Sequence, residues 1–352
     1  MRAANAARLS SLVASSHWRR SRLLILCYHG IALNDEDRWN PGLYVSAAHF
    51  RRRMEILRRM GCAVLPLDDA LRRLHADALP ARSVVLTFDD GFYDVYSVAW
   101  PILREFSLPA TVYLTTYYVD RNWPVFGLLC SYLLWKSSRT ELRWPEVLGA
   151  PVTLDDAGRR QVSAALSAYC DKNDLSGRQK DALAGELAGR LDVDAGLLRA
   201  QRVLHLMNPG EVGEVARQGA DIQLHTHRHC VCRFPRVLER EIAENGRRIQ
   251  ELTGRTPAHF CYPSGVVPPG SPVWLRDCGA LSATTCEAGI ASGRTAPFVL
   301  PRLLDSSGIT DVEFAAWVSG TAALLPRRSI SGADGALIEE PLVEVRTASR
   351  GS

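Results

Sequence analysis

Short apolar runs alternate along this chain with longer segments whose apolar residues recur at helical spacing. Runs rich in β-branched, leucine and aromatic residues predict buried strands, and the segments between them predict helices. The expected strands are residues 23–28, 63–65, 83–86, 110–114, 221–224, 258–262, 280–285 and 298–300. Strands and helices that alternate in this way indicate an α/β fold with a parallel sheet, either open or closed into a barrel.

Capping residues mark where several helices begin and end. Ser46 is a typical N-cap for a helix that carries Phe50, Met54 and Leu57 on one face, and Gly61 is placed to end it. Further helices are expected from residue 68, over 94–106 and over 234–252.

One domain is expected to hold most of the chain. From about 120 to 218 the strand signal fades and helical spacing takes over, which predicts a helical insertion inside a domain that spans 21–325. Residues 1–20 are expected to form a loosely ordered basic arm, and 326–352 a flexible tail. A chain of 352 residues is long enough for a barrel of ~250 residues with such an insertion.

Composition excludes several classes of protein. Apolar residues make up 47% and charged residues 23%, which does not fit a disordered or fibrous chain. The net charge of +4 is spread along the chain, so a nucleic-acid partner is not expected. Nine cysteines, odd in number and without framework spacing, favour reduced thiols in a cytosol.

The N-terminal region carries no membrane-spanning signal. Its apolar run, 23–27, is much shorter than the ~20 residues of a span, and no signal-peptide cleavage site is recognised. We therefore expect a cytoplasmic protein. Arg19, Arg20 and Arg22 could give weak contact with a membrane surface.

Two adjacent carboxylates follow the expected strand at 83–86, in the sequence Thr-Phe-Asp-Asp-Gly at 87–91. Like charges this close repel, so a fold that buries them tends to neutralise one with a metal or a proton, which leaves the other free to act as a base. Asp89 and Asp90 are therefore candidate site residues. The alternative is a helix cap, because Asp followed by Gly is common at strand-to-helix turns.

Residues 225–229 hold three histidines in five positions, directly after another expected strand. Imidazole is the commonest protein ligand for transition metals, so this cluster is a candidate metal site. His225 and His229 converge if the chain turns helically, whereas all three histidines share a face if the strand continues. A structural zinc site with Cys230 and Cys232 is the rival interpretation, although no Cys-x-x-Cys pair is nearby to complete it.

A third candidate segment is Phe-Cys-Tyr-Pro-Ser-Gly at 260–265. Cys261 could act as a nucleophile with a histidine base, but its place inside a strand-like stretch favours a buried small apolar residue. Taken alone, 263–265 is an ordinary Pro-Ser-Gly turn.

Together these motifs resemble a known family. Thr-Phe-Asp-Asp-Gly followed far downstream by His-Thr-x-x-His is similar to the polysaccharide deacetylases, the NodB-homology domain of carbohydrate esterase family 4, over about residues 23–304. The resemblance implies a distorted (β/α) barrel of about seven strands. It also implies a metal-dependent hydrolase that removes acetyl groups, N-acetyl before O-acetyl, from an acetylated sugar, oligosaccharide or polysaccharide in carbohydrate metabolism or bacterial surface-glycan biosynthesis.

The resemblance also assigns roles to individual residues. Asp89 corresponds to the catalytic base, and the metal ligands correspond to Asp90, His225 and His229, with His227 a neighbour of the site. One carboxylate and two imidazoles suit a divalent cation, with zinc expected first and cobalt, nickel, iron or manganese also compatible.

The third motif of the family corresponds to residues 262–265. In the family a backbone N–H in this turn binds the oxyanion, which implies Ser264 here, and Tyr262 is implied to contact substrate.

The chain departs from the family pattern at three places, one of which is that the tryptophan-containing fourth motif is not recognisable. Cys261 occupies the position of an arginine that orients the base, and the late Leu-x-His that supplies the general acid is absent from 299–303. His29, at the end of the first strand, is a candidate acid, or else a histidine bonded to a loop carbonyl. Arg302 could pair with Asp89 or contact substrate. These departures keep two alternatives open, an amidohydrolase acting on a non-sugar C–N bond and a catalytically inactive glycan-binding relative.

Overall fold

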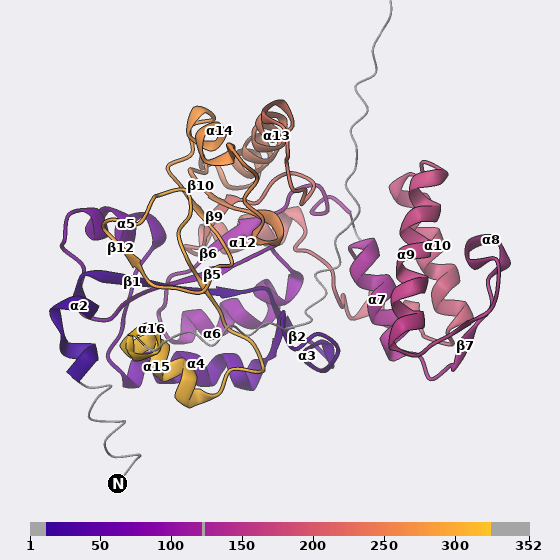
Figure 1. Ribbon diagram of the computed structural model, residues 1–352, viewed down its shortest axis with the longest axis horizontal. Helices are drawn as coiled ribbons and strands as arrows, with labels where there is room; N and C mark the ends of the chain where they lie inside the picture. Colours follow the sequence, from indigo (N-terminus) through magenta and orange to yellow (C-terminus); the bar gives the residue numbers. More distant parts are fainter. Residues whose placement is uncertain (1–11, 122–123, 325–352) are drawn as a thin grey trace, which may run out of the picture. The chain divides into compact units, whose positions relative to one another are not determined.

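The computed structural model describes residues 12–121 and 124–324 (Figure 1). Of these residues, those up to 124 and those from 196 onward form one compact unit, and 125–195 form a second. The expected tail from 326 lies outside the described residues, as do the first eleven residues of the expected arm.

Six parallel strands form the centre of the first unit. Their order in the sheet is β11-β10-β9-β6-β5-β1, and every neighbouring pair is parallel. The bounds are β1 (Arg22–Tyr28), β5 (Ser83–Phe88), β6 (Thr111–Leu114), β9 (Asp221–Leu224), β10 (His259–Cys261) and β11 (Ser282–Thr284). Six of the strands expected from the apolar runs are therefore present here, with β11 shorter than the run that predicted it.

A seventh strand joins the two edges of this sheet. β13 (Leu303–Leu304) pairs with β1 in parallel, and Leu300, just before it, bridges to Thr284 of β11. Within the described residues, seven parallel strands thus make a distorted (β/α) barrel, which confirms the expected fold class. The strand expected at 298–300 is reduced to the bridge at Leu300. The short strands β4 (Ala63–Val64) and β12 (Ala291–Ser292) pair with β5 and β1.

Helices cover the outside of the strands. The longer ones are α4 (Ala47–Arg59), α5 (Leu67–His75), α12 (Pro209–Arg217), α13 (Pro235–Thr253), α14 (Ser271–Asp277) and α15 (Asp311–Ser319). Figure 1 shows α13 and α14 on one side of the strands and α4 and α15 on another. The Ser46 hydroxyl accepts the His49 N–H at 3.1 Å, as expected of the N-cap of α4. The helix expected over 94–106 begins as a π-helix, η1 (Val95–Ala99), and continues as α6 (Trp100–Glu105).

Alternate residues of each strand pack on opposite faces. Leu24 and Leu26 of β1 belong to the large apolar cluster that the outer helices cover, whereas Ile25 belongs to a separate cluster with Val85, Tyr113 and Leu300 from other strands. Because side chains alternate along a strand, the second cluster is the inside of the barrel. Positions 85, 87 and 89 share that inward direction.

The second unit is mainly helical. It contains α7 (Phe126–Lys136), α9 (Asp156–Lys172), α10 (Gly177–Arg190) and a small antiparallel pair of β7 (Glu141–Leu142) and β8 (Val152–Thr153). Leu133, Leu166 and Leu187 are buried in it. The sequence places the insertion at about 120–218, whereas the compact unit comprises 125–195, and α12 lies in the first unit.

The described part of the N-terminal arm is tied to the barrel. α2 (His17–Arg20) precedes β1, and Arg19 is fully buried, donating to the carbonyls of Val318, Arg22 and Ser83 at 3.0, 2.8 and 3.2 Å. The expectation that Arg19 contributes to a membrane contact is therefore wrong, because its charge is enclosed in protein. Among the described residues, no helix has both the length and the apolarity to cross a bilayer.

Candidate active site

Asp89 and Asp90 lie directly after β5, and their side chains part because the backbone changes conformation between them. The Asp89 N–H still donates to the Tyr28 carbonyl at 2.9 Å, so Asp89 continues the strand and points inward. Asp90 has a φ of +68°, and Gly91 a φ of +86°. A Cβ on Gly91 would lie 2.3 Å from Leu114 Cδ1, so the turn requires glycine here. The Asp-Asp-Gly motif thus sends two adjacent carboxylates to different partners.

Asp90, His225 and His229 converge on one point. One ligand atom from each lies within 4.8 Å of the others. Asp90 Oδ1 is 3.2 Å from His225 Nε2 and 3.3 Å from His229 Nε2, and the two imidazole centroids are 5.0 Å apart. His227 turns away, with its Nδ1 2.8 Å from the Thr116 hydroxyl.

Left-handed backbone at two non-glycine residues produces this convergence. Thr226 has a φ of +62° and His229 a φ of +53°, so the segment after β9 continues neither the strand nor a helix. The Thr226 hydroxyl accepts the Cys230 N–H at 3.1 Å and closes the turn. Sequence reasoning had left open which histidines pair, since both regular conformations were plausible.

The orientation of His225 fits a bound cation. Its Nδ1 is 2.9 Å from the Cys261 carbonyl, which can only accept, so Nδ1 carries the proton and Nε2 presents a lone pair. That lone pair faces Asp90 Oδ1, a buried oxygen that accepts no hydrogen bond from the residues described. Two electron pairs that face each other at this distance require a positive charge between them, either a cation or a proton on His225. Burial lowers the pKa of His225, but Cys261, Asp90 and Asp89 outweigh it and raise that pKa well above its usual value.

The ionisation of Asp90 and His229 fits a bound cation. Burial raises the pKa of Asp90, but His229 and His225 outweigh it and lower that pKa to about 2. Burial lowers the pKa of His229 to about 4 against the opposing effect of Asp90. At neutral pH Asp90 is therefore an anion and His229 a neutral imidazole, the forms in which both groups bind metals.

Asp89 is paired with Arg302 inside the barrel. The guanidinium donates to Oδ1 and to Oδ2, each at 2.7 Å, and both side chains are buried. Burial would raise the pKa of the Asp89 carboxyl, but Arg302, with a contribution from His29, holds it well below its usual range. The expectation that Arg302 contacts substrate is wrong, because the residue has no exposed surface and is saturated by its partners.

Cysteine thiols complete the surroundings of this ion pair. Cys261 Sγ is 3.4 Å from Asp89 Oδ2 and 3.1 Å from an Arg302 nitrogen, and Cys27 Sγ is 3.6 Å from Asp89 Oδ2. Cys261 is fully buried in the inner cluster, as its strand position predicted. Its small side chain leaves the space that the Arg302 guanidinium occupies.

His29 lies beside the same carboxylate. Its Nε2 is 3.7 Å from Asp89 Oδ2, its side chain is 13% exposed, and its Nδ1 is buried without a hydrogen-bond partner among the described residues. The imidazole therefore reaches from solvent to Asp89, which a histidine bonded to a loop carbonyl would not do.

The turn at 262–265 places its two candidate residues differently. Tyr262 is buried in the outer cluster, with its ring edge-on to Phe260 at 5.2 Å, so the expectation that it contacts substrate is wrong. Ser264 is partly exposed and has a φ of +55°. Gly265 and Val266 donate back to the carbonyls of Tyr262 and Pro263 at 3.0 and 3.2 Å, which makes the turn tight.

Cys230 and Cys232 do not form a metal site with the histidines. Their sulfurs are 3.2 Å apart, and neither belongs to any of the groups of potential ligands found in the described part of the chain. Cys232 is buried in the outer cluster. The rival structural zinc interpretation therefore finds no support in the geometry.

Two polar residues of α13 hold the segment 225–229, which carries the candidate histidine ligands. Neither residue was identified from the sequence. Asn245 Oδ1 accepts the His225 N–H at 2.9 Å, and Glu241 Oε2 accepts the Arg228 N–H at 2.8 Å. Both side chains are buried on the apolar face of the helix. A carboxylate and an amide at i and i+4 on an apolar helix face were the available signal.

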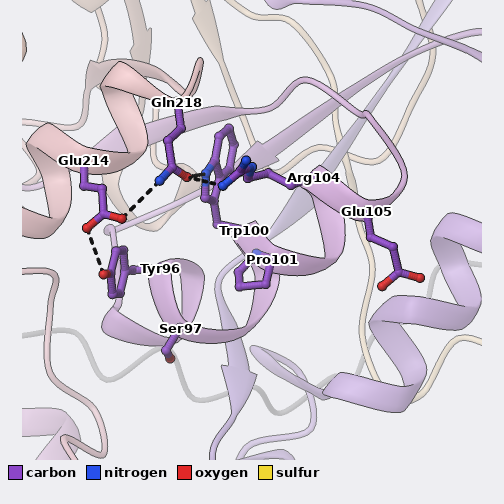
Figure 2. Close-up of a pocket in the computed structure, with 8 residues that line it drawn as sticks. All are labelled: Tyr96, Ser97, Trp100, Pro101, Arg104, Glu105, Glu214 and Gln218. Carbon is purple, nitrogen blue, oxygen red and sulfur yellow. Dashed lines mark hydrogen bonds between the residues drawn. The ribbon is translucent and has the colours of Figure 1, made fainter.

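A groove on the outside of the barrel is separate from these residues. It has a volume of about 740 Å³ and is lined by η1, α6 and α12 (Figure 2). Glu214 accepts from the Tyr96 hydroxyl at 2.9 Å and from Gln218 at 3.0 Å, and Gln218 accepts from the Trp100 indole at 2.7 Å. Tyr96, Trp100, Glu214 and Gln218 are thus joined by hydrogen bonds. None of the metal-site residues lines the groove.

Part of the chain is similar in sequence to known proteins. The polysaccharide deacetylase family profile matches residues 76–141 and 187–280, and its gap falls within the helical second unit. The chain is 32% identical over 95 residues to YxkH of Bacillus subtilis (strain 168), whose name refers to a polysaccharide deacetylase, covering 27% of this chain and 32% of that protein. It is 30% identical over 102 residues to the poly-β-1,6-N-acetyl-D-glucosamine N-deacetylase of Escherichia coli (strain K12), covering 28% of this chain and 15% of that protein. It thus spans about a third or less of these curated relatives.

Solved structures extend the likeness over most of the chain. The Streptococcus pyogenes deacetylase PplD in complex with acetate has a TM-score of 0.56 at 18% identity, covering 87% of this chain and 99% of that one. IcaB from Ammonifex degensii has a TM-score of 0.54 at 19% identity, covering 85% and 97%. At these identities the likeness establishes the fold. The profile match and the aligned segments of the curated relatives place the matched part of the chain, residues 76–141 and 187–280, in the polysaccharide deacetylase family.

Proposed function

We propose that this protein is a metal-dependent hydrolase that removes acetyl groups, N-acetyl groups first, from a sugar or polysaccharide. The observation that supports this most is that the adjacent residues Asp89 and Asp90 belong to two neighbouring groups, a set of candidate metal ligands and an ion pair with Arg302. Asp90 faces the Nε2 atoms of two imidazoles, and Asp89 is kept ionised by Arg302 beside them. A ligand set and a base that stand side by side are what hydrolysis of an amide or ester requires.

Asp90, His225 and His229 would hold the cation, zinc or one of cobalt, nickel, iron and manganese. A bound divalent cation supplies Lewis acidity and lowers the pKa of water. Three protein ligands leave open positions for substrate and water, which suits catalysis better than a closed structural site. Asp90 as an anion and His229 as a neutral imidazole need no proton rearrangement before they bind. His225, whose pKa is raised well above its usual value, would give up one proton as the cation binds.

Asp89 would accept the proton of the attacking water. Arg302 keeps the carboxylate ionised and fixes its plane by bonding both oxygens, so its remaining lone pairs have a defined direction. His29, 3.7 Å from Asp89 Oδ2, would return a proton to the leaving amine. His29 would then serve as the general acid, the role for which this chain lacks the family's Leu-x-His motif.

The Ser264 N–H would bind the oxyanion that forms as the acetyl carbonyl is attacked. The left-handed conformation at Ser264 and the tight turn that follows it hold this N–H in a fixed direction. A Cβ on Gly265 would lie 2.7 Å from Cys286 Cβ, so the turn packs closely against the barrel.

The substrate class rests on the relatives. One of them is named for the N-deacetylation of poly-β-1,6-N-acetyl-D-glucosamine, which supports an N-acetylated hexosamine glycan here, in bacterial surface-glycan biosynthesis or another carbohydrate pathway. The nine free cysteines support a reducing compartment such as the bacterial cytoplasm.

Acetate release tests the proposal. Metal-reconstituted protein is incubated with N-acetylated oligosaccharides, O-acetylated oligosaccharides, cyclic amides and ureides, and product acetate or amine is measured. We expect acetate from the N-acetylated glycans, at a rate that falls by about 10²–10⁴ when Asp89→Asn removes the base. Turnover of the cyclic amides alone would show a non-sugar amidohydrolase, and glycan binding without turnover by any metal form would show an inactive relative.

A further inference from the structure

The segment from His225 to His229 has to be held in a conformation that its residues do not prefer. Thr226 is β-branched, and both Thr226 and His229 have left-handed backbone angles, which are unfavourable for residues other than glycine. A hydrogen bond from the Cys230 N–H, just beyond the segment, to the Thr226 hydroxyl is a short local contact. Something outside the segment must therefore fix the distance between the two imidazoles.

Asn245 fixes the first end of the segment. Its Oδ1 accepts the His225 N–H at 2.9 Å, and its amide nitrogen donates to the Leu114 carbonyl and to the Thr116 hydroxyl, each at 2.9 Å. The side chain is fully buried. One amide thus links the ligand segment to the end of β6, the strand beside β9.

Glu241 fixes the other end from one helical turn away. Oε2 accepts the Arg228 N–H at 2.8 Å and Oε1 accepts from the Arg228 guanidinium at 2.5 Å, next to ligand His229. Its side chain is 1% exposed, whereas the Arg228 side chain is 33% exposed. Burying a carboxylate is costly, and replacing a buried ion pair with apolar residues is often neutral or stabilising. Stability alone therefore does not account for Glu241 on this face.

We propose that Glu241 and Asn245 of α13 are positioning residues that set the separation and direction of the two imidazole ligands. Neighbours at i and i+4 on one helix have a rigid spacing, so the helix acts as a template for both ends of the segment. Partners one step removed from a metal tune its affinity. This inference rests on the proposed function, since it assumes that the imidazoles bind a metal.

Metal affinity tests whether Glu241 and Asn245 position the imidazole ligands, and it can be measured without any enzymatic turnover. Apo-protein is titrated with Zn²⁺ in competition with a chromophoric chelator, and with Co²⁺ while its visible absorption is recorded. We expect Asn245→Ala and Glu241→Gln each to bind Zn²⁺ about 10–100-fold more weakly than the wild type. We also expect each variant to change the Co²⁺ spectrum, because the ligands are no longer held at one geometry.

Two variants of the same helix serve as controls. Glu239→Gln removes an exposed carboxylate of α13, and Ile242→Val removes a buried methylene between the two proposed residues. Ile242→Val should lower stability and leave the Zn²⁺ affinity and the Co²⁺ spectrum unchanged. If Asn245→Ala does not fold, Glu241→Gln and Arg228→Met, which removes the partly exposed guanidinium bonded to Glu241, still test the other end of the segment.

The outcomes separate this inference from the proposed function. A wild-type protein that binds neither Zn²⁺ nor Co²⁺ overturns the proposed function and this inference with it. A wild type that binds both, together with Asn245→Ala and Glu241→Gln proteins that bind them as tightly and with the same spectrum, overturns this inference alone.

Discussion

Arg302 donates to both carboxylate oxygens of Asp89 at 2.7 Å, although the two residues are 213 positions apart in the sequence. The arginine comes from the segment that closes the barrel, next to β13, and the aspartate from the end of β5. By the family resemblance, Cys261 stands where an arginine would orient the base. Here the guanidinium beside the Asp89 carboxylate comes instead from Arg302, in a different part of the barrel. The ion pair therefore depends on closure of the sheet.

Arg302→Lys should shift the acid limb of the pH–rate profile to higher pH. A lysine cannot bond both oxygens, so the Asp89 pKa, which Arg302 now holds well below its usual range, should rise. A base acts only when ionised, so activity should be lost at a higher pH as pH falls. Acetate release measured across pH checks this, and a profile superimposable on that of the wild type would contradict the role given to Arg302.

Asp90→Ala should abolish stoichiometric metal, whereas Asp89→Asn should retain it. Asp90 is the proposed anionic ligand, and Asp89 points inward to Arg302. For Asp89→Asn we expect kcat to fall by about 10²–10⁴, the contribution typical of a general base. Elemental analysis of purified proteins, with acetate release in parallel, makes the comparison. Metal retained by Asp90→Ala would refute the ligand assignment.

Gly91→Ala should destabilise the protein and weaken the metal site together. A φ of +86° is unfavourable for alanine, at a cost of about 1–3 kcal/mol, and the new Cβ would lie 2.3 Å from Leu114 Cδ1. The turn that directs Asp90 must shift to relieve the clash. Urea unfolding and zinc titration are the measurements. Gly61→Ala is the matched control, because its φ is +63° but nothing lies within 4 Å of the added Cβ.

Stability should fall as pH drops below about 6.5, the pKa of an unperturbed histidine. Burial lowers the pKa of His205 and of His259 in the folded protein, so the unfolded chain binds more protons between the lowered pKa values and 6.5. The unfolding free energy therefore increases with pH through this window, by at most about 1.4 kcal/mol per pH unit for each group.

Urea unfolding near pH 5.5 and near pH 7.5 tests this dependence, about one unit on either side of 6.5. His205→Gln should flatten the pH dependence, and replacement of the exposed His75 should leave it as in the wild type. An equal slope in the His205→Gln protein would show that the lost stability comes from other groups.

The pattern of apolar residues was enough to predict most of the barrel. β1 and β5 are continuous buried runs, and the helix that begins after Ser46 has the cap its sequence indicates. The last strand was placed at 298–300, but the pairing with β1 occurs at Leu303 and Leu304. A strand of two residues has no pattern of its own, and its place depends on where the edges of the sheet meet.

Local order along the chain accounts for the motif residues themselves. Asp89, Asp90 and Gly91 follow a strand in sequence, so their position at its end could be inferred before the fold was known. The partners of these residues could not. Arg302, Asn245 and Glu241 reach the site by barrel closure and by the packing of α13, and such contacts between distant segments have no counterpart in local pattern. The side chains that would perform the chemistry thus lie in short sequence motifs. The groups that position them or keep them ionised reach the site only through tertiary packing.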